Sequence, residues 1–495
     1  MAIETTTDTS TPGRGRYEAV IGIEVHCQLR TESKMFCACA TAYEASPPNT
    51  HVCPVCLGLP GALPVINRRA VEHVLATGLA IEATTPEATR WDRKNYFYPD
   101  LPKGYQISQY DLPLASAGRL TVETSDGPFT IGITRAHLEE DTAKLIHSTG
   151  SDGRKVSLID FNRSGAPLME IVTDPDIRTA EQARRYAEEL QLLLRTIGAS
   201  DADMERGQMR VEANVSLRPP GATAFGTRVE VKNMNSFRSV ERAIDYEIER
   251  QAAALDAGDP LAQETRGWSD DKAATYRMRS KETSDDYRYF PEPDLPPLHV
   301  DPAWLAELRS AMPELPAARR TRFQQDLHLS AYDATVLVGD PDAGALFEAT
   351  VASDPSVASK SVANWVTGEY LRLRNAAPAD APVSVDPTQL AALVGLVDAG
   401  SISRANGKEV FAAHATSSAD VATIVAERGY HQISDEDVVG KAVDEALAAN
   451  PNAVTDYKAG KTQVIGFLVG QVMKATKGQA DASVVQGLVR ARLDR

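Results

Sequence analysis

The sequence predicts an α+β protein in which a mixed or antiparallel β-sheet is followed by helical domains. Apolar and polar side chains alternate, as in half-buried strands, over much of residues 17–290. Five prolines crowd residues 291–302 and exclude a continuous helix there. Helical spacing dominates from Asp301 onward. A chain of 495 residues is long enough for roughly two to four domains.

We expect four segments along the chain. Residues 1–16 are rich in Thr, Ser and Gly and lack the apolar core of a signal peptide, which is typical of a disordered tail. Residues 17–300 form the sheet domain, residues 301–407 a helical domain, and residues 408–495 an Ala-rich helical tail domain. No run of about 18 apolar residues occurs, so we expect no membrane span and a cytoplasmic location, where thiols stay reduced.

Side-chain periodicity predicts the individual elements. Strands are expected at residues 20–26, 130–134, 156–160, 168–172, 209–215 and 228–232. Thr179 is a suitable N-cap for a helix whose apolar residues continue at helical spacing to Leu194. A second helix is expected over residues 240–255. Strands and helices without regular βαβ repetition indicate a mixed or antiparallel sheet.

Glutamates occupy the middle of the polar face of three expected strands, in the segments GIEVH, RVEAN and RVEVK. If the strands share a sheet, a divalent cation is needed to neutralise these carboxylates, and Mg²⁺ in turn binds nucleotide phosphates. Residues 135–141 add consecutive acids, although a solvated turn would show the same pattern. The candidate magnesium ligands are Glu24, His26, Glu139, Glu140, Glu212 and Glu230.

Polar segments near these strands are candidates for holding ATP. The candidate nucleotide-binding residues are Arg135, Asp160, Asn162, Arg163, Lys232 and Asn233. Asn233 comes shortly before an expected helix, whose N-terminus could meet phosphate oxygens. Ordinary turn formation by Asn and Gly, or simple N-capping, would explain the same residues.

Four of the five cysteines lie in one short stretch, as Cys37 and Cys39 followed by Cys53 and Cys56. Two close pairs separated by a loop are typical of a tetrahedral Zn²⁺ site. Four sulfur ligands leave no open position, so such a zinc would be structural. The alternatives are unligated thiols or redox chemistry at Cys53 and Cys56. Cys27 lies on an apolar strand face and is expected in the core.

Residues 94–100 and 285–294 mix aromatic side chains with charges of both signs. Aromatic rings beside cations can stack nucleobases. Because both segments also carry acids, we expect core aromatics with a polar rim.

The net charge of −16 argues against indiscriminate nucleic-acid binding. The last 45 residues nevertheless carry seven Lys or Arg against three Asp, a local charge of +4. This asymmetry indicates either a terminus that binds a polyanion or a solvated basic helix end.

Together these segments resemble the B subunit of bacterial tRNA-dependent amidotransferases, from Tyr17 to the C-terminus. The most specific pieces are residues 22–26, 94–100, 105–109, 135–141, 160–165, 230–237, 285–294 and 466–478. The resemblance implies a glutamine-synthetase-like catalytic cradle, a helical domain and a YqeY-like tail that binds tRNA.

The resemblance also implies the activity of an ATP-dependent carbon–nitrogen ligase. ATP phosphorylates the side-chain carboxylate of glutamate on tRNA(Gln) or of aspartate on tRNA(Asn), and ammonia then displaces phosphate. The A subunit, a partner amidase, releases the ammonia from glutamine, and the small C subunit is the third member of the heterotrimer. By resemblance Glu24, Glu140, Lys94 and Lys103 are catalytic, and Lys94, Lys103 and Glu140 line the ammonia path. The four cysteines match family members that hold zinc.

Two other functions stay open at this stage. A free-standing ATP-dependent ligase for a small acid would turn over without tRNA or partner subunits. A non-enzymatic zinc protein that binds RNA would consume no ATP. The sequence contains no complete P-loop, amidase motif or serine triad, so we expect that the chain does not hydrolyse an amide itself.

Overall fold

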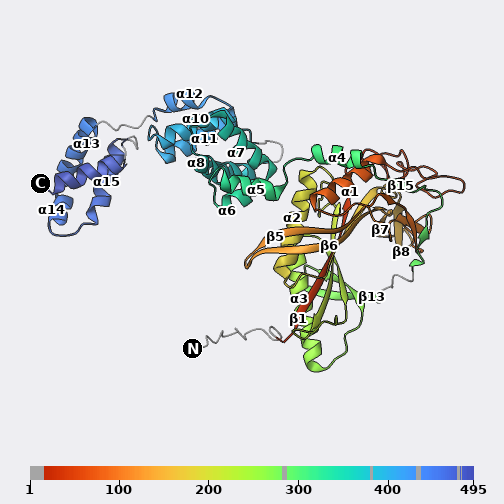
Figure 1. The fold of residues 1–495 in the computed structure, drawn as a ribbon. Helices are drawn as coiled ribbons and strands as arrows, with labels where there is room; N and C mark the ends of the chain where they lie inside the picture. Colours follow the sequence, from red (N-terminus) through yellow and green to blue (C-terminus); the bar gives the residue numbers. More distant parts are fainter. Residues whose placement is uncertain are drawn as a thin grey trace. The chain divides into compact units, whose positions relative to one another are not determined.

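The computed structural model describes residues 16–280, 287–378, 383–430, 436–476, 480 and 482–494 (Figure 1). The expected disordered tail, residues 1–16, lies outside this part of the chain except for Arg16. The chain forms two compact units, Met1–Leu315 and Pro316–Arg495, and each is described by itself. Among the described residues, no helix is both long enough and apolar enough to span a bilayer.

An eight-stranded sheet is the centre of the first unit in the described part of the chain. Its strands, in spatial order, are β13 (Ala274–Ser280), β12 (Glu264–Ser269), β11 (Val229–Met234), β10 (Met209–Arg218), β1 (Glu18–Gln28), β9 (Pro167–Thr173), β6 (Gly127–Glu140) and β5 (Ala115–Thr124). Neighbours pair antiparallel except β11 and β12, which are parallel. The predicted α+β class with a mixed sheet is therefore confirmed.

Smaller sheets lie beside the large one. They are formed by β14 (Phe290–Pro291), β3 (Asp92–Asn95) and β4 (Tyr105–Ser108), by β15 (Leu298–His299) and β2 (Ala88–Thr89), and by the hairpin of β7 (Lys144–Thr149) and β8 (Lys155–Asp160). Strand β4 packs against β6. This contact brings the β3–β4 pair to the carboxyl end of β6, where the predicted site residues lie.

Three helices pack on the apolar face of the large sheet: α1 (Arg68–Ala80), α2 (Ala180–Thr196) and α3 (Phe237–Ala257) (Figure 1). That face carries Ile21, Ile23 and Val25, which are fully buried together with Cys27. Thr179 caps α2 as predicted, in a reciprocal capping box with its third residue. Because the helices cover one face, the opposite face is left to the polar residues of the same strands.

Helix α4 (Pro302–Ser310) packs against α1, and the Arg68 guanidinium lies 5.0 Å from the centroid of the Trp304 ring. The first compact unit therefore continues to Leu315, past the boundary expected at residue 300. The boundaries after residues 16, 300 and 407 stay predictions.

The second unit is helical throughout its described elements. These are α5 (Pro316–Gln325), α6 (Ala331–Gly339), α7 (Pro341–Ser353), α8 (Ser359–Asn364), the π-helical stretch η2 (Trp365–Tyr370), α9 (Leu371–Ala376), α10 (Pro387–Asp398), α11 (Arg404–Ser417), α12 (Val421–Arg428), α13 (Glu436–Ala449), α14 (Pro451–Lys458), α15 (Val464–Ala475) and α16 (Ala482–Leu493). The expected boundary at residue 407 falls inside α11. Buried residues between Val439 and Leu493 form a core of their own.

Candidate active site

The register of β1 with its neighbours brings the predicted glutamates onto one face of the sheet. Glu24 lies opposite Glu212 of β10, and His26 lies opposite Glu170 of β9. Glu170 in turn lies opposite His137 of β6. Directly opposed residues share a face of the sheet, so these side chains form a continuous polar row.

The first carboxylate group consists of Glu24, Glu212 and Glu230. One oxygen from each lies within 4.8 Å of the others. The Lys232 ammonium lies 2.7 Å from a Glu212 oxygen and 3.9 Å from a Glu230 oxygen, and the Asn214 amide donates to Glu24 over 2.7 Å. Burial opposes charge on Lys232, but the Glu212 carboxylate raises the pKa of the lysine. The group therefore holds its lysine in the charged form.

The second group consists of His26, Glu139 and Glu170, whose ligand atoms also lie within 4.8 Å of one another. His137 contacts both acids, with Nε2 3.3 Å from Glu170 and 3.5 Å from Glu139. The Lys94 ammonium lies 3.6 Å from a Glu139 oxygen. Burial favours a neutral Glu139, but the Lys94 charge outweighs it and lowers the pKa of Glu139 to about 2. The carboxylate is therefore ionised at neutral pH.

Both donor sets fit a hard divalent cation, which prefers carboxylate oxygens and accepts an occasional imidazole. The candidate magnesium ligands that the sequence suggested thus fall into two separate groups. Glu170 was missed by the sequence reasoning, although it stands in the middle of the expected strand at residues 168–172, the same signal that identified Glu24. Among the described residues, Glu140 belongs to neither group.

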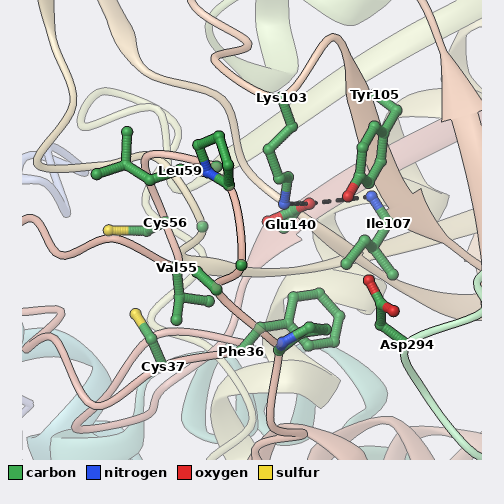
Figure 2. Close-up of a pocket in the computed structure, with 16 residues that line it drawn as sticks. Phe36, Cys37, Val55, Cys56, Leu59, Lys103, Tyr105, Ile107, Glu140 and Asp294 are labelled. Atoms are coloured by element: carbon green, nitrogen blue, oxygen red, sulfur yellow. Dashed lines mark hydrogen bonds and ion pairs between the residues drawn. The ribbon is translucent and has the colours of Figure 1, made fainter.

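Glu140 lies instead in a cavity of about 220 Å³ (Figure 2). It forms an ion pair with Lys103 and accepts a hydrogen bond of 3.0 Å from the backbone N–H of Ile107. Successive side chains of a strand leave it on opposite sides, which separates Glu140 from Glu139. Cys37 and Cys56 line the same cavity.

The four predicted zinc ligands Cys37, Cys39, Cys53 and Cys56 place their sulfurs within 4.8 Å of one another. A tetrahedral zinc with bonds of about 2.3 Å requires sulfurs about 3.8 Å apart, and the Cys53 and Cys56 sulfurs are 3.8 Å apart. All four are free of disulfides.

The surroundings of Cys56 favour a thiolate. A hydrogen bond from the Cys37 thiol, helped by the backbone N–H of Cys53 and the Lys34 charge, lowers the pKa of Cys56 to about 4. Lys34 is 1% exposed, and its ammonium lies 3.6 Å from the Cys56 sulfur. A preformed thiolate is the form that binds metal, so the donor set fits zinc.

The predicted nucleotide-binding residues between 160 and 163 have structural partners. Asn162 is fully buried and accepts a hydrogen bond from the backbone N–H of His51 over 2.8 Å. Asp160 accepts one from the backbone N–H of Asn49 over 3.0 Å. Arg163 donates to two backbone carbonyls. The bonds of Asn162 and Asp160 fasten the loop between Cys39 and Cys53, and those of Arg163 hold the segment that follows β6. Both are expected for the alternative of a structural turn.

The other three predicted nucleotide-binding residues lie on β6 and β11 of the large sheet. Lys232 belongs to the first carboxylate group. Arg135 lies opposite Val172, which lies opposite Glu24, so Arg135 shares the polar row. Asn233 is exposed and donates to the Tyr276 hydroxyl over 3.2 Å.

Two larger clefts adjoin the carboxylate groups. The first, of about 430 Å³, is lined by Glu24 and Asn214 and walled by apolar side chains that include Val172 and Phe225. The second, of about 900 Å³, is lined by Lys94, Lys232 and aromatic residues of the segment 94–100. The first therefore reaches Glu24 directly, and the second reaches the glutamates through their lysines.

The expectation that the aromatic residues of segment 94–100 belong to the core is wrong for two of them. Phe97 is 82% exposed and Tyr98 is 55% exposed. They lie in the turn between β3 and β4, where neither side chain reaches the core that the large sheet forms with its helices.

Comparison with known proteins covers both units. A family model described as the GatB/GatE catalytic domain matches residues 19–306, and a second, described as the GatB domain, matches residues 345–493. The chain belongs to the GatB family. The residues matched as the catalytic domain include both carboxylate groups, the four cysteines and both clefts.

Similar full-length members of this family carry one name, which describes each as the B subunit of an aspartyl/glutamyl-tRNA(Asn/Gln) amidotransferase. The protein from Moorella thermoacetica is 52% identical over 480 residues, which are 96% of this chain and 100% of that protein. Those from Dehalococcoides mccartyi and Roseiflexus castenholzii are 48% and 49% identical, each over 97% of this chain and 99% of the relative. The resemblance drawn from the sequence segments is therefore confirmed.

Proposed function

We propose that this chain is the transamidating B subunit of a tRNA-dependent amidotransferase. It converts glutamate carried by tRNA(Gln), or aspartate carried by tRNA(Asn), into the amide, working in the cytoplasm with an amidase as the A subunit and a small protein as the C subunit. The names of its relatives support this reaction and these partners. The observation that carries the proposal is the polar sheet face, where two carboxylate-rich groups adjoin two clefts.

The chemistry explains why such a face is needed. A carboxylate is a poor acyl donor because oxide would have to leave, so the γ-phosphoryl group of ATP is first transferred to a carboxylate oxygen and ADP departs. Ammonia then attacks the acyl carbon, the bond to the phosphate oxygen breaks, and the nitrogen gives up a proton as phosphate leaves. Bound Mg²⁺, held by the two glutamate groups, would offset the repulsion between the carboxylate and the phosphates.

The smaller of the two clefts suits the adenosine of ATP. Its apolar walls, Val172 and Phe225 among them, adjoin Glu24 of the first carboxylate group. A nucleoside bound there would direct its phosphates toward that group. In this assignment Asp160 and Asn162 do not contact the nucleoside, because their hydrogen bonds hold a loop. Lys232 and Arg135 are then the candidates for binding the phosphates.

Lys94 and Lys232 lie between the carboxylates and the larger cleft. Their positive charges suit the incoming substrate carboxylate and its acyl phosphate. Lys103 and Glu140 are assigned to the ammonia path, because their ion pair lies in a separate cavity whose walls include Phe36 and Val55. A small neutral molecule would pass such walls more readily than an ion.

The test is an assay of the purified chain, with and without the two partner subunits, given ATP, glutamine and misacylated tRNA. We expect ADP and amidated tRNA only when charged tRNA is present, with glutamine use requiring the partner subunits. Turnover on free glutamate or aspartate without tRNA would support the small-acid ligase instead. RNA binding without ATP consumption would support the zinc protein, and either result overturns the proposal.

A further inference from the structure

We propose that the cleft of about 900 Å³ binds the 3′-terminal adenosine of the charged tRNA, with the Phe97 ring as the surface on which the adenine stacks. The inference rests on the proposed function and adds the location of the nucleoside that carries the reacting amino acid. Its starting point is an exposed aromatic ring beside the entrance to a catalytic face.

The cleft leads to both carboxylate groups. Lys94 lines it and lies 3.6 Å from Glu139, while Lys232 lines it and lies 2.7 Å from Glu212. Ligand pockets in proteins have volumes of roughly 300–1,000 Å³. A volume of about 900 Å³ therefore accommodates a nucleoside together with an attached amino acid.

The chemistry of the substrate requires such a space. The amino acid is esterified to the ribose of the terminal adenosine, so only a few bonds separate the reacting carboxylate from the base. Whatever site receives the carboxylate must also receive the nucleoside. The cleft whose lining lysines contact Glu139 and Glu212 meets both requirements at once.

Phe97 has the exposure that a stacking surface needs. The residue is 82% exposed, and an aromatic face beside cationic groups can stack a nucleobase. The ring rests on Gly104, where an added Cβ would approach a ring carbon to 3.1 Å. The neighbouring Tyr96, in contrast, is half-buried and makes an edge-to-face contact with Tyr287. Phe97 therefore offers an open ring face at a supported position.

The wall beside Phe97 carries polar groups suited to a nucleotide. Arg288 is exposed and lines the cleft, and its backbone carbonyl accepts a hydrogen bond of 2.8 Å from the Asn95 amide. Its guanidinium suits the phosphate that precedes the terminal adenosine. Asp100 lines the same cleft and offers an acceptor for ribose hydroxyls. The combination of ring, cation and acceptor favours a nucleotide over an apolar protein segment.

The experiment uses the assembled complex and a stable probe, 3′-deoxy-3′-(glutamylamino)adenosine, as a competitor of charged tRNA in the amidation assay. Phe97→Ala should raise the inhibition constant of the probe about tenfold, since base stacking contributes about this much. Phe97→Leu should behave like Phe97→Ala, because it keeps apolar volume without the ring. Phe97→Trp should retain or improve inhibition.

Glutaminase activity and the KM for ATP should stay unchanged in all three variants. Leu158→Ala removes another exposed apolar side chain of the first unit and should leave the inhibition constant unaltered. Equal inhibition of the wild type, Phe97→Ala and Phe97→Leu would overturn the inference. So would weakened assembly of the complex with unchanged inhibition, which would assign Phe97 to a protein interface. A wild type without tRNA-dependent amidation would contradict the proposed function instead.

Discussion

Glu139 and Glu140 are adjacent in the sequence but belong to different sites. Glu139 lies among Lys94, His137 and the second carboxylate group, whereas Glu140 pairs with Lys103 in the cavity beside the cysteines. The alternation of side chains along β6 produces this division. It places a candidate cation site and a candidate ammonia path one residue apart.

Substitution of either glutamate by glutamine should therefore impair a different reaction. Glu139→Gln should lower tRNA-dependent ADP formation by about 100-fold, because it removes a charge from the cation group. Glu140→Gln should leave ADP formation within a few-fold and lower glutamine-driven amidation more than amidation driven by added ammonium salt. Parallel assays with the two nitrogen sources measure the difference. Loss of ADP formation in Glu140→Gln would indicate instead that Glu140 takes part in phosphoryl transfer.

Glu170 should be as important for magnesium-dependent activity as Glu139. It accepts from His137 over 3.3 Å and lies 3.7 Å from His26, so Glu170→Gln should raise the Mg²⁺ concentration for half-maximal activity by about tenfold or more. Glu188→Gln, a change on the surface of α2, is the matched control. Identical magnesium titrations of Glu170→Gln and the wild type would remove Glu170 from the metal site.

The cysteine site should depend on Lys34. Zinc with four thiolates carries two net negative charges, and the buried ammonium 3.6 Å from Cys56 compensates part of them. Lys34→Met should speed zinc release to a chelator by about tenfold, in line with other residues that support metal ligands. Cys39→Ser should lower the zinc content and the melting temperature of the first unit. Glu170→Gln should keep its zinc, which separates the two metal sites.

Substitution of Gly226 should weaken ATP binding in the smaller cleft. A Cβ at this position would lie 1.9 Å from the backbone oxygen of Leu217, so Gly226→Ala must displace the loop that contributes Phe225 to the wall. The KM for ATP should rise about tenfold, the scale of one lost base-stacking contact, while glutaminase activity is retained. Gly339→Ala, where an added Cβ meets nothing within 4 Å, should change neither. An unaltered KM for ATP in Gly226→Ala would place the nucleotide elsewhere.

The stability of the first unit should depend on pH through Glu247. This buried carboxylate of α3 binds Arg250, Arg266 and Thr275. Burial would raise the pKa of Glu247, but the hydrogen bonds from Arg250 and Thr275 outweigh it and lower the pKa below its usual value. Because the unfolded carboxyl binds its proton more readily, this stabilisation is present above the unfolded pKa of about 4.3 and is lost as the pH falls through the folded pKa.

Glu247→Gln should therefore lower the free energy of unfolding by about 3 kcal/mol at pH 7. The difference from the wild type should shrink as the pH falls below about 4, because the unfolded carboxyl takes up its proton there while the native carboxyl stays ionised to lower pH. Denaturant unfolding of both proteins at several pH values measures it. A difference that stays constant with pH would contradict the role of the ionised carboxylate.

The sequence by itself determined which side of each strand is polar. The period of two is a local property, so Glu24, Glu212 and Glu230 could be assigned to one kind of surface before any pairing was known. The spacing of the cysteines is equally local and indicated the zinc ligands. The capped helix beginning after Thr179 followed from neighbouring residues alone.

Only the tertiary structure decided which polar residues meet. The position of β1 between β10 and β9 separates the glutamates into two groups and adds Glu170 to one of them. The folded chain also leaves Phe97 exposed, and it places Asn162 where its side chain holds a loop. The choice of neighbouring strand and its register depends on burial summed over the whole sheet. No local pattern of side chains contains that information.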